Sequence, residues 1–391
     1  MTRLRCQVLV VGAGPAGSAT AAGLARAGLD VLLVEARSHP RPKACAEYAS
    51  PRIAEELRRI GLPDAAWRPA ALPLEGMRVI RDEAAVQVGY RDRSGRRNAW
   101  GVERTALDAA LAAHARDSGV RLMERTVLTD LEWRHGLPVG ATLRGPGGTL
   151  AARFDWVIGA DGARSRVASR LGVARPAFPR RIGLVAHYEN VPGLDDHGEM
   201  HVGPGWYVGL APLVGDRLNV GMALPLGRDG GSAEARVEAA IDGIPAVARR
   251  LRGSRRLTPI RGAAPIGSRV SSAAGPGWIL VGDAAGFIDP FTGEGIYRAL
   301  RSARAAVEAF TPGEAGAHER YLAARRRAFA AKDALTWVVQ GMLAAGPLMG
   351  YTLRRLASRP ALADRLGSAL GDCRPASDVL SPAYLARVLR P

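Results

Sequence analysis

The feature that most constrains the fold of this chain is a glycine-rich segment close to its N-terminus. The pattern Gly12-x-Gly14-x-x-Gly17 follows a short apolar run at residues 6–11 and precedes a stretch at 18–27 that is rich in Ala and Leu. The first run is typical of a buried parallel strand and the second of a helix. A second apolar run, at 30–35, ends on Glu35. Residues 6–35 therefore predict a β-α-β unit whose glycine-rich turn joins strand to helix.

Each position of this pattern has a physical reason if a dinucleotide binds there. Gly12 permits a tight turn, Gly14 lets the backbone approach a pyrophosphate, and Gly17 allows close packing of helix on strand. The helix N-terminus supplies free N–H groups and a partial positive charge for the phosphates. Glu35 accepts hydrogen bonds from ribose hydroxyls and disfavours a 2′-phosphate. These residues therefore predict a site for the ADP half of FAD or NAD, and not for NADP.

Two later segments also end a predicted strand on small residues and an aspartate. Residues 155–162 (DWVIGADG) precede 163–165 (ARS), and residues 282–286 (GDAAG) precede Pro290 and the segment 293–296 (GEGI). Taken alone, the first of these is equally compatible with an ordinary strand–turn–helix junction. In the second, glycine permits close backbone approach, and the aspartate can bind a sugar-like hydroxyl. The helix that starts near Gly295 would face the negative charge that a reduced flavin carries at its N1–C2 carbonyl edge.

The three motifs in this order resemble the p-hydroxybenzoate-hydroxylase-like superfamily of FAD-dependent enzymes, from near residue 5 to about residue 305. The resemblance implies that Asp161 and Gly162 support the pyrophosphate side and the NAD(P)H path, and that Asp283 holds the ribityl chain. It also implies that Arg104 contacts FAD, against the alternative of a surface salt bridge beside Glu103. The residues expected to bind FAD are Gly12, Gly14, Pro15, Ala16, Gly17, Glu35, Ala36, Arg37, Lys43, Ala44, Cys45, Arg104, Val127, Asp161, Gly162, Gly282, Asp283, Pro290, Gly293, Gly295 and Ile296.

Within that superfamily, residues 282–302 (GDAAGFIDPFTGEGIYRALRS) and 42–51 (PKACAEYASP) are similar to the geranylgeranyl-reductase-related branch. The resemblance implies that Cys45 lies near the flavin, and Cys45 and Tyr48 are the candidate catalytic proton donors. The branch usually has Gly where this chain has Ala46. Residues 205–212 (GWYVGLAP) replace the Trp-x-Phe-Pro run typical of prenyl reductases. Trp206 and Tyr207 alternate faces of a predicted strand, and both are candidate substrate contacts.

The charge of the chain first suggests a nucleic-acid binder. Its 391 residues contain 54 Lys+Arg and 37 Asp+Glu, which give a formal net charge of +17. Lys43 and Lys332 are the only lysines, so the positive charge is almost all arginine, and no segment interleaves aromatic with basic residues. We therefore expect no nucleic-acid partner. We place Arg37, Lys43, Arg104 and Arg164 beside an anionic cofactor instead.

Cysteine and histidine usage favours a reducing compartment without a structural metal. Cys6, Cys45 and Cys373 are too widely spaced for a disulfide framework or a metal knuckle. His187, His197 and His201 lack metal-ligand spacing, and we interpret them as sheet or loop residues and predict no metal site. The N-terminus leads directly into a strand, so we expect no cleaved signal peptide and a cytoplasmic protein.

The element pattern predicts an α/β fold with a Rossmann-like FAD-binding domain, an antiparallel β-sheet substrate domain and a helical C-terminal segment. We expect a discontinuous FAD domain at 1–75, 100–175 and 265–315. The substrate domain would take 76–99 and 176–264, and the helical segment 316–391. A helix is expected between 233 and 251, and Thr105 with Asp108 has the spacing of a capping box that opens another helix.

One apolar stretch, at 334–353, reaches membrane-span length but contains Gln340, Gly346 and Pro347. Three interpretations are open: C-terminal core helices broken at Gly346-Pro347, a cover over a hydrophobic substrate pocket, or peripheral membrane contact helped by basic flanks. The sequence predicts no oligomeric state.

These patterns together predict an FAD-dependent oxidoreductase acting on a hydrophobic small molecule. With one dinucleotide fingerprint in the chain, NAD(P)H would dock transiently against the FAD face and pass a hydride to the flavin. Our first hypothesis is a reductase that hands this hydride to a C=C bond. The alternative is a monooxygenase of secondary metabolism that hydroxylates a phenolic or polyketide-type substrate through a flavin hydroperoxide. A third class would be a non-enzymatic FAD-binding or basic nucleic-acid-associated protein.

Overall fold

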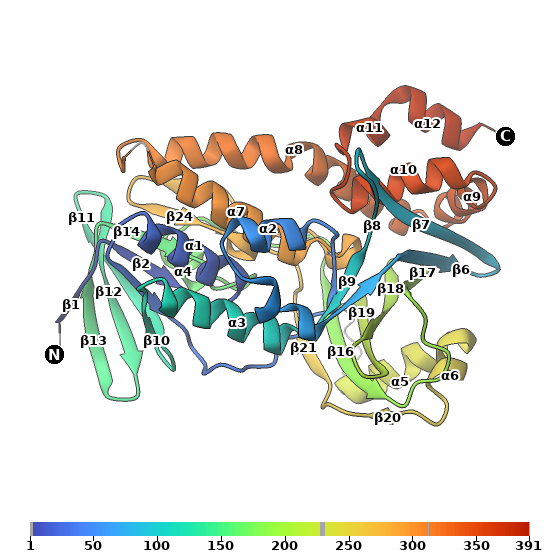
Figure 1. The fold of residues 1–391 in the computed structure, drawn as a ribbon, viewed down its shortest axis with the longest axis horizontal. Helices are drawn as coiled ribbons and strands as arrows, with labels where there is room; N and C mark the ends of the chain where they lie inside the picture. Colours follow the sequence, from blue (N-terminus) through green and yellow to red (C-terminus); the bar gives the residue numbers. More distant parts are fainter. Residues whose placement is uncertain (1–2, 227–230, 312, 391) are drawn as a thin grey trace.

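A computed structural model describes residues 3–226, 231–311 and 313–390. At its centre lies a sheet in the order β10 (Arg121–Met123), β3 (Val31–Val34), β2 (Val8–Val11), β14 (Trp156–Gly159), β24 (Trp278–Leu280) and β23 (Ala274–Gly275). All pairings are parallel except that of β23. The middle strands are apolar and fully buried, because helices and a second sheet cover the two faces. This layering confirms the predicted α/β class (Figure 1).

Helices α1 (Pro15–Arg26), α3 (Arg104–Asp117) and α7 (Gly295–Phe310) pack together on this sheet. The capping-box prediction for α3 was wrong, since Glu103 precedes the helix without a side-chain cap. Asp108 binds the guanidinium of Arg104 instead. An antiparallel layer that sequence reasoning missed shares the same hydrophobic core. Its strands are β11 (Val127–Arg134), β12 (Leu137–Gly145) and β13 (Gly148–Arg153), with β1 (Arg3–Arg5) at the edge.

A nine-stranded sheet joins segments that lie far apart in the sequence. Its order is β20 (Arg255–Arg256), β16 (Arg181–Glu189), β19 (Arg217–Pro225), β18 (Trp206–Leu213), β17 (His197–Gly203), β6 (Gly76–Arg81), β7 (Ala84–Asp92) and β8 (Gly95–Arg97), and β21 (Arg261–Ala263) pairs with β16. Only the β17–β6 pairing within this sheet is parallel. The hairpin at 76–97 therefore completes the sheet that starts at residue 181.

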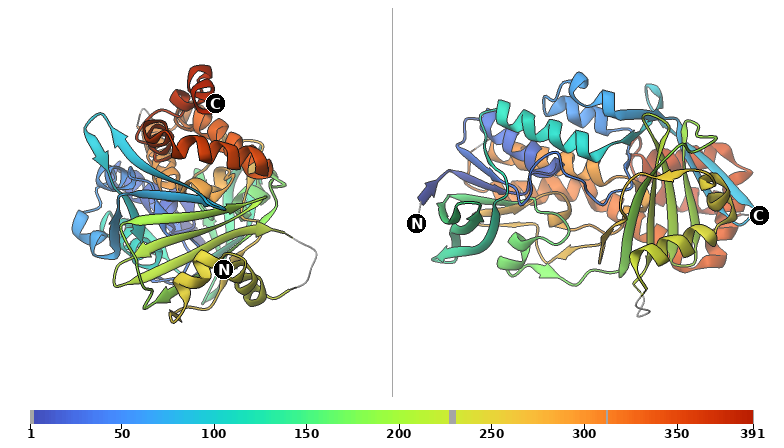
Figure 2. Two further views of the ribbon diagram at one scale, coloured as in Figure 1. Left: turned by 90° about the vertical axis from the view of Figure 1, so that its right-hand side faces the viewer. Right: turned by 90° about the horizontal axis from the view of Figure 1, so that it is seen from below.

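Helices cover both faces of this large sheet (Figure 2). One face packs against α5 (Ala233–Asp242) and α6 (Pro245–Leu251). The single helix predicted for this region is two helices, because Pro245 has no N–H with which to continue the first one. The other face packs against the C-terminal helices α8 (Ala317–Ala344), α9 (Gly346–Ala357), α10 (Pro360–Leu370), α11 (Ser377–Leu380) and α12 (Pro382–Leu389).

The apolar stretch at 334–353 forms the end of α8 and the start of α9. The break falls at Ala345, directly before Gly346 and Pro347, as predicted. Leu335, Val339 and Leu343 are buried in the core that α8 and α9 share with the large sheet. In the described ranges, no helix is both long and apolar enough to cross a membrane. Trp337, on the outer side of α8, is 41% exposed, and peripheral membrane contact stays a prediction.

Smaller elements connect the two large sheets. A three-stranded sheet comprises β4 (Tyr48–Ala49), β9 (Ala99–Val102) and β5 (Ala71–Leu74), and a two-stranded one comprises β15 (Ala174–Arg175) and β22 (Arg269–Val270). Helices α2 (Ile53–Arg59) and α4 (Arg166–Arg170) are short, as are the 3-10 turns η1 (Asp64–Ala66), η2 (Arg68–Ala70), η3 (Gly282–Ala285) and η4 (Pro290–Thr292). The three predicted motifs thus all emerge at the ends of β2, β14 and β24, which are adjacent strands.

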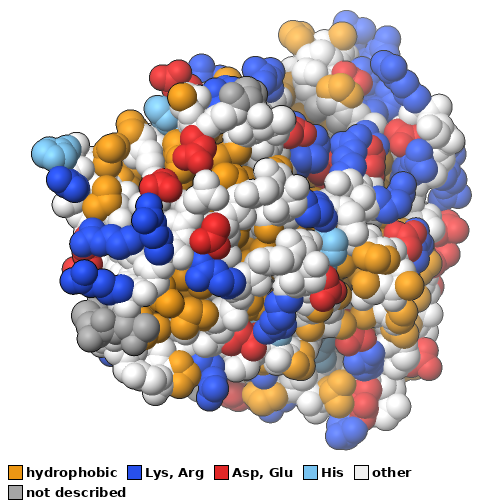
Figure 3. Space-filling model, turned by 60° about the vertical axis from the view of Figure 1, so that its left-hand side comes forward, with side chains coloured by type: hydrophobic (Ala, Val, Ile, Leu, Met, Phe, Trp, Pro, Cys, Tyr) orange, Lys and Arg blue, Asp and Glu red, His pale blue; other side chains and the backbone are white. Residues whose placement is uncertain are grey.

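Arginine side chains are spread over the surface. On the face shown in Figure 3, Lys and Arg side chains lie interspersed with Asp, Glu and apolar side chains. Many of the arginines are paired with carboxylates, as Arg121 is with Asp30 at 2.8 Å and Arg78 with Asp195 at 2.6 Å. Such exposed pairs contribute little to stability.

Candidate active site

The glycine-rich turn has the geometry that its residues predict. Gly12 has φ +100°, and a Cβ placed on it would lie 2.6 Å from the carbonyl oxygen of Ala160. A Cβ on Gly17 would lie 1.7 Å from the carbonyl oxygen of Gly12, so only glycine fits there. At Gly14, the residue before α1, an added Cβ would meet nothing nearer than Arg41 Nη2 at 3.6 Å. The space in front of the α1 N-terminus is therefore open, as a pyrophosphate requires.

Glu35 lies at the end of β3 and faces this turn. Its Oε2 accepts the N–H of Ala13 at 2.9 Å and its Oε1 accepts the N–H of Arg37 at 3.0 Å. Arg41, which sequence reasoning missed, reaches the same carboxylate at 3.3 Å. The Nε of Arg41 is buried without a hydrogen-bond partner among the described residues, so this cation has a donor to spare for an anionic guest. The sequence signal that could have identified Arg41 is its position in a polar loop, four residues before Cys45.

The other predicted residues of the ADP end lie around Glu35. Ala36 and Arg37 are exposed directly after it. The carbonyl of Glu35 accepts the N–H of Thr126, which places Val127 at the start of β11 beside this turn. Pro15 and Ala16 form the first turn of α1 and are buried.

Asp161 shapes its turn through its own hydrogen bonds. Its carboxylate accepts the Oγ–H of Ser165 at 2.5 Å and the N–H groups of Arg166 and Val167 at 2.7 and 3.2 Å, at the start of α4. Burial raises the pKa of Asp161 and these hydrogen bonds oppose that rise. The adjacent Gly162 has φ +82°, and a Cβ there would lie 3.7 Å from Lys43 Nζ. The Asp-Gly turn therefore faces the predicted Lys43 loop.

The third motif brings Asp283 close to Lys43 and Arg104. Gly282 packs on Ala16, where an added Cβ would lie 2.9 Å from the Ala16 methyl carbon. Burial raises the pKa of Asp283, whereas Lys43 and Arg104 lower it. Burial and the nearby Arg104 lower the pKa of Lys43, although its side chain is solvent-accessible. Lys43, Arg104 and Asp283 thus lie close enough together to influence one another's charge.

Arg104 is fixed where α3 begins. Its guanidinium donates two hydrogen bonds to Asp108, at 2.8 and 2.9 Å, and only 8% of the residue is exposed. Burial lowers its pKa, and Asp108 together with the sulfur of Cys45 raises it. The alternative of a surface salt bridge with Glu103 is wrong, because Arg104 is buried and pairs with Asp108, while Glu103 pairs with Arg217. Arg104 therefore lies beside the Cys45 sulfur, and its contact with FAD stays a prediction.

The start of α7 also faces this region. Gly293 has φ +66° and Glu294 precedes the helix, with Pro290 in the preceding turn. Nothing lies within 4 Å of a Cβ placed on Gly295, so the helix N-terminus is open, while Ile296 anchors the helix in the core. These features fit a flavin carbonyl edge held at the helix N-terminus.

The two candidate proton donors differ in their surroundings. The hydroxyl of Tyr48 hydrogen-bonds the carbonyl of Gly76 at 3.1 Å and the hydroxyl of Tyr90 at 2.7 Å. Burial raises the pKa of Tyr48 well above its usual value, and the neighbouring Tyr90 raises it further. Cys45 is half-buried, next to Ala44 in the loop, and its sulfur accepts the N–H of Glu47 at 3.4 Å.

Of the two candidate substrate residues, the structure places Tyr207 on the face of β18 that looks toward the motif loops. Its hydroxyl donates a hydrogen bond to Asp289 at 2.6 Å. Its ring packs edge-to-face against Phe291, with the ring centroids 5.2 Å apart. Trp206 lies on the opposite face and packs in the cluster formed by α5 and α6. Sequence reasoning missed Asp289 and Arg181, whose buried ion pair at 2.6 Å holds Tyr207 in place.

Three further polar residues lie between the Cys45 loop and the large sheet. The carboxylate of Glu47 contacts His187 Nε2 at 2.7 Å and accepts from Asn219 Nδ2 at 3.1 Å. The interpretation of His187 as a plain sheet residue therefore missed a contact that only the packing of β16 on this loop creates. His197, by contrast, binds Asp196 and Gln87 near Asp195, and we assign no metal role to that group.

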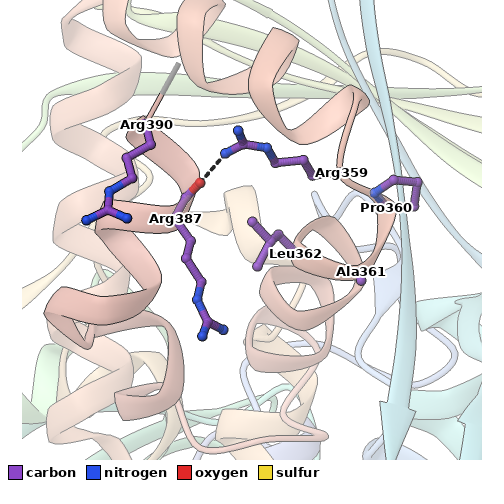
Figure 4. A pocket seen from close by; sticks show the side chains of 6 residues that line it. All are labelled: Arg359, Pro360, Ala361, Leu362, Arg387 and Arg390. Carbon is purple, nitrogen blue, oxygen red and sulfur yellow. Dashed lines mark hydrogen bonds between the residues drawn. The ribbon is translucent and has the colours of Figure 1, made fainter.

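A hollow of about 510 Å³ lies elsewhere, among the C-terminal helices (Figure 4). Its lining consists of Arg359, Pro360, Ala361, Leu362, Arg387 and Arg390. Arg359 donates to the carbonyl of Arg387 across it. The hollow contains none of the motif residues.

Comparison with known proteins agrees with this geometry. A family model described as an FAD binding domain matches residues 5–332. The chain is 33% identical over 328 residues to the menaquinone reductase of Mycolicibacterium smegmatis, which covers 79% of this chain and 77% of that protein. It is also 33% identical over 313 residues to the digeranylgeranylglycerophospholipid reductase of Methanothrix thermoacetophila, covering 78% and 77%.

Solved structures share the fold at lower identity. A triple mutant of the flavin-dependent brominase Bmp2 has a TM-score of 0.82 at 22% identity, over 97% of this chain and 98% of that one. A geranylgeranyl bacteriochlorophyll reductase-like protein from Thermoplasma acidophilum has a TM-score of 0.76 at 22% identity, over 99% and 96%. At this identity the likeness concerns the fold alone. Chains of this fold therefore include both reductase-like and halogenating flavoproteins.

Proposed function

Because this chain belongs to the FAD binding domain family and is an FAD-dependent oxidoreductase, we propose that it is a reductase of a hydrophobic small molecule. The reaction would add a hydride and a proton across a C=C bond of that substrate. The observation that carries the proposal is the cluster of charged side chains that Lys43, Arg104 and Asp283 form beside Cys45. Two relatives at 33% identity, named menaquinone reductase and digeranylgeranylglycerophospholipid reductase, support the reductase class.

The residues present fit FAD. The open N-terminus of α1 and the spare donor of Arg41 suit the pyrophosphate, and Glu35 suits the ribose of the ADP half. The carboxylate of Asp283 has no hydrogen-bond partner in the described part of the chain, so it is available to ribityl hydroxyls. When bound, FAD supplies the hydride chemistry that the polypeptide lacks.

The charge of this cluster has a second role. Lys43 and Arg104 put two cations near Asp283, and these cations favour an anionic form of a bound group over a neutral one. Arg104 is held rigidly by its two hydrogen bonds to Asp108, so little reorganisation is needed when negative charge develops.

A proton donor completes the proposed reduction. Cys45 is the better candidate because its thiol is half-buried beside Arg104, whereas Tyr48 directs its hydroxyl to Gly76 and Tyr90. The Sγ–H bond of Cys45 would break as the substrate carbon takes the proton, and solvent would return a proton to the sulfur. This role predicts that Cys45→Ala loses turnover while Tyr48→Phe retains most of it.

The electron donor in this proposal is NAD(P)H. The chain has one dinucleotide fingerprint, at Gly12 to Gly17, and Glu35 disfavours a 2′-phosphate in that site. The nicotinamide donor would therefore dock transiently against the face that carries Asp161 and Gly162. The substrate would lie on the Tyr207 face of the large sheet, against the aromatic pair that Tyr207 forms with Phe291.

Anaerobic turnover tests the proposal. Purified FAD-loaded protein is mixed with NADH or NADPH and with menaquinone or a geranylgeranyl lipid, under strict exclusion of oxygen. We expect oxidation of the nicotinamide and a product two hydrogens heavier, by mass spectrometry. If the reduced protein leaves every substrate unchanged until oxygen is admitted, and the product then gains one oxygen atom, the reductase proposal fails and the monooxygenase alternative stands.

A further inference from the structure

The segment that carries Cys45 is attached to the large sheet at three successive residues. Asn219 Nδ2 donates to the carbonyl of Cys45 at 2.9 Å. Ala46 packs on Gly221, where an added Cβ would lie only 2.8 Å from the Ala46 Cβ. The carboxylate of Glu47 meets Asn219 Nδ2 at 3.1 Å and His187 Nε2 at 2.7 Å. His187 on β16 and Asn219 on β19 thus hold this segment, which comprises residues 45–47.

Glu47 is held more tightly than an ordinary loop residue. It has φ +57°, a left-handed conformation that a residue with a side chain adopts when surrounding contacts impose it. It is 3% exposed, and its Oε1 accepts the N–H of Arg104 at 2.8 Å. Its carbonyl accepts the N–H of Val102 at 2.8 Å. The segment is therefore fixed from two sides, by the large sheet and by the start of α3.

His187 serves this arrangement without being free to react. Its Nε2 faces Glu47, and its Nδ1 lies 3.1 Å from the hydroxyl of Thr258. Because both ring nitrogens are engaged within the protein, neither is available to a substrate. Asn219 is fully buried, and its amide group is likewise directed to the segment. These side chains hold the loop and do not touch the reacting atoms.

The attachment leaves the Cys45 sulfur with one hydrogen bond among the described residues, from the N–H of Glu47 at 3.4 Å. The carbonyl of Cys45 is bound by Asn219, the neighbouring Ala46 lies against the sheet, and the Cys45 sulfur is within interaction range of Arg104. We infer that His187, Asn219 and Glu47 are positioning residues that hold the Cys45 thiol beside Arg104. The catalytic meaning of this placement rests on the proposed role of Cys45 as proton donor.

The test measures the thiol directly. FAD-loaded protein is treated with iodoacetamide, and the rate of modification of Cys45 is followed by peptide mass spectrometry in His187→Phe, Asn219→Ala and Gly221→Ala. The first two remove polar contacts, while the third adds a methyl group that would displace Ala46. A matched control is His201→Phe, because His201 likewise pairs with a glutamate, Glu199 at 3.0 Å, but on the opposite face of the sheet. His187→Gln, which retains a donor near the Nε2 position, is the conservative variant.

We expect each of the three variants to label about tenfold faster, since the loss of one charge-assisted hydrogen bond or of close packing raises local opening by about that factor. His187→Gln should return toward the wild-type rate, and His201→Phe should match it. The inference is overturned if folded Asn219→Ala and Gly221→Ala both label at the wild-type rate, or if His201→Phe accelerates labelling as much as His187→Phe. Labelling needs no turnover, so a failed anaerobic assay would refute the reductase proposal without deciding this one.

Discussion

Lys332 is one of two lysines in the chain, and it is buried among carboxylates that tie the C-terminal helices to the start of α7. Its Nζ lies 3.0 Å from Glu294 and 2.9 Å from Asp372, and it donates to the carbonyls of Ala369 and Leu370 at 2.8 and 2.7 Å. Lys332 is 5% exposed and Glu294 3%. We predict that Lys332→Met, which keeps the volume but removes the charge, strongly destabilises the protein.

The magnitude follows from what the substitution leaves behind. Asp372 stays buried without its cation, while Glu294 keeps only Arg298, at 3.4 Å, among the residues that the structure describes. Breaking a buried ion pair from one side costs about 3–5 kcal/mol. With a urea dependence of about 2–3 kcal/mol per molar, the unfolding midpoint should fall by about 1–2.5 M. Urea titration followed by circular dichroism measures this shift.

The pH dependence has a definite sign. Burial raises the pKa of Asp372 and Lys332 lowers it, so removing Lys332 raises that pKa further. An acid whose pKa is raised by folding binds its proton more readily in the folded state, so its contribution favours folding at low pH and is lost as the pH rises. The loss of unfolding free energy in Lys332→Met should therefore become smaller as the pH is lowered from 7 toward 5.

Two comparisons make this prediction refutable. The double variant Lys332→Met/Asp372→Asn should regain part of the lost stability, because it also removes the charge of the Asp372 carboxylate. Lys43→Met, which changes the other lysine but leaves no such buried pair, should alter the free energy of unfolding by less than about 1 kcal/mol. If the free energy of unfolding of Lys332→Met at pH 7 is within about 1 kcal/mol of the wild-type value, the buried ion pairs of Lys332 do not stabilise the protein as predicted.

Three further predictions concern the cofactor site and the thiols. Gly14→Val should abolish retention of FAD, because its side chain would enter the open space before α1, and a purified variant that stays yellow would remove the turn from the site. Asp283→Asn should weaken FAD binding about tenfold in fluorescence titration, since its carboxylate would lose a charge-assisted hydrogen bond, while unchanged affinity would place the ribityl chain elsewhere. Burial raises the pKa of Cys6 to about 11 and of Cys373 to about 12, so native protein at pH 8 should expose one reactive thiol, Cys45, to a thiol reagent. Modification of two or three thiols at equal rates would contradict that last prediction.

The residues that sequence patterns located well are those whose role is set by their immediate neighbours. A Cβ on Gly17 would meet the carbonyl oxygen of Gly12, and Gly12 itself has φ +100°, so both requirements arise within that turn, although Ala160 also crowds Gly12. Glu35 was recognisable because it ends the next strand of the same β-α-β unit. The break before Gly346-Pro347 follows from the missing N–H of a single residue.

The residues that sequence reasoning missed depend on contacts between distant segments. Glu47 and Asn219 are 172 positions apart, and Arg181 and Asp289 are 108 apart. Neither pair has a spacing that any local pattern records, because their meeting depends on how the large sheet packs on the motif loops. Strands β11 to β13 were missed although they contain 8, 9 and 6 residues, because none of them has a marked apolar run.

The sequence by itself predicted the glycine-rich turn and the strand-end acid of the expected FAD site, because such features depend on local backbone geometry that neighbouring residues specify. Only the tertiary structure decided which side chains complete it. It directed Tyr207 toward the motif loops and Trp206 away from them, and it buried Lys332 beside Glu294. It also assembled His187, Asn219 and Glu47 around the Cys45 segment. The physical reason is that a buried polar group must find its partner in space, and that partner comes from whichever element packs against it.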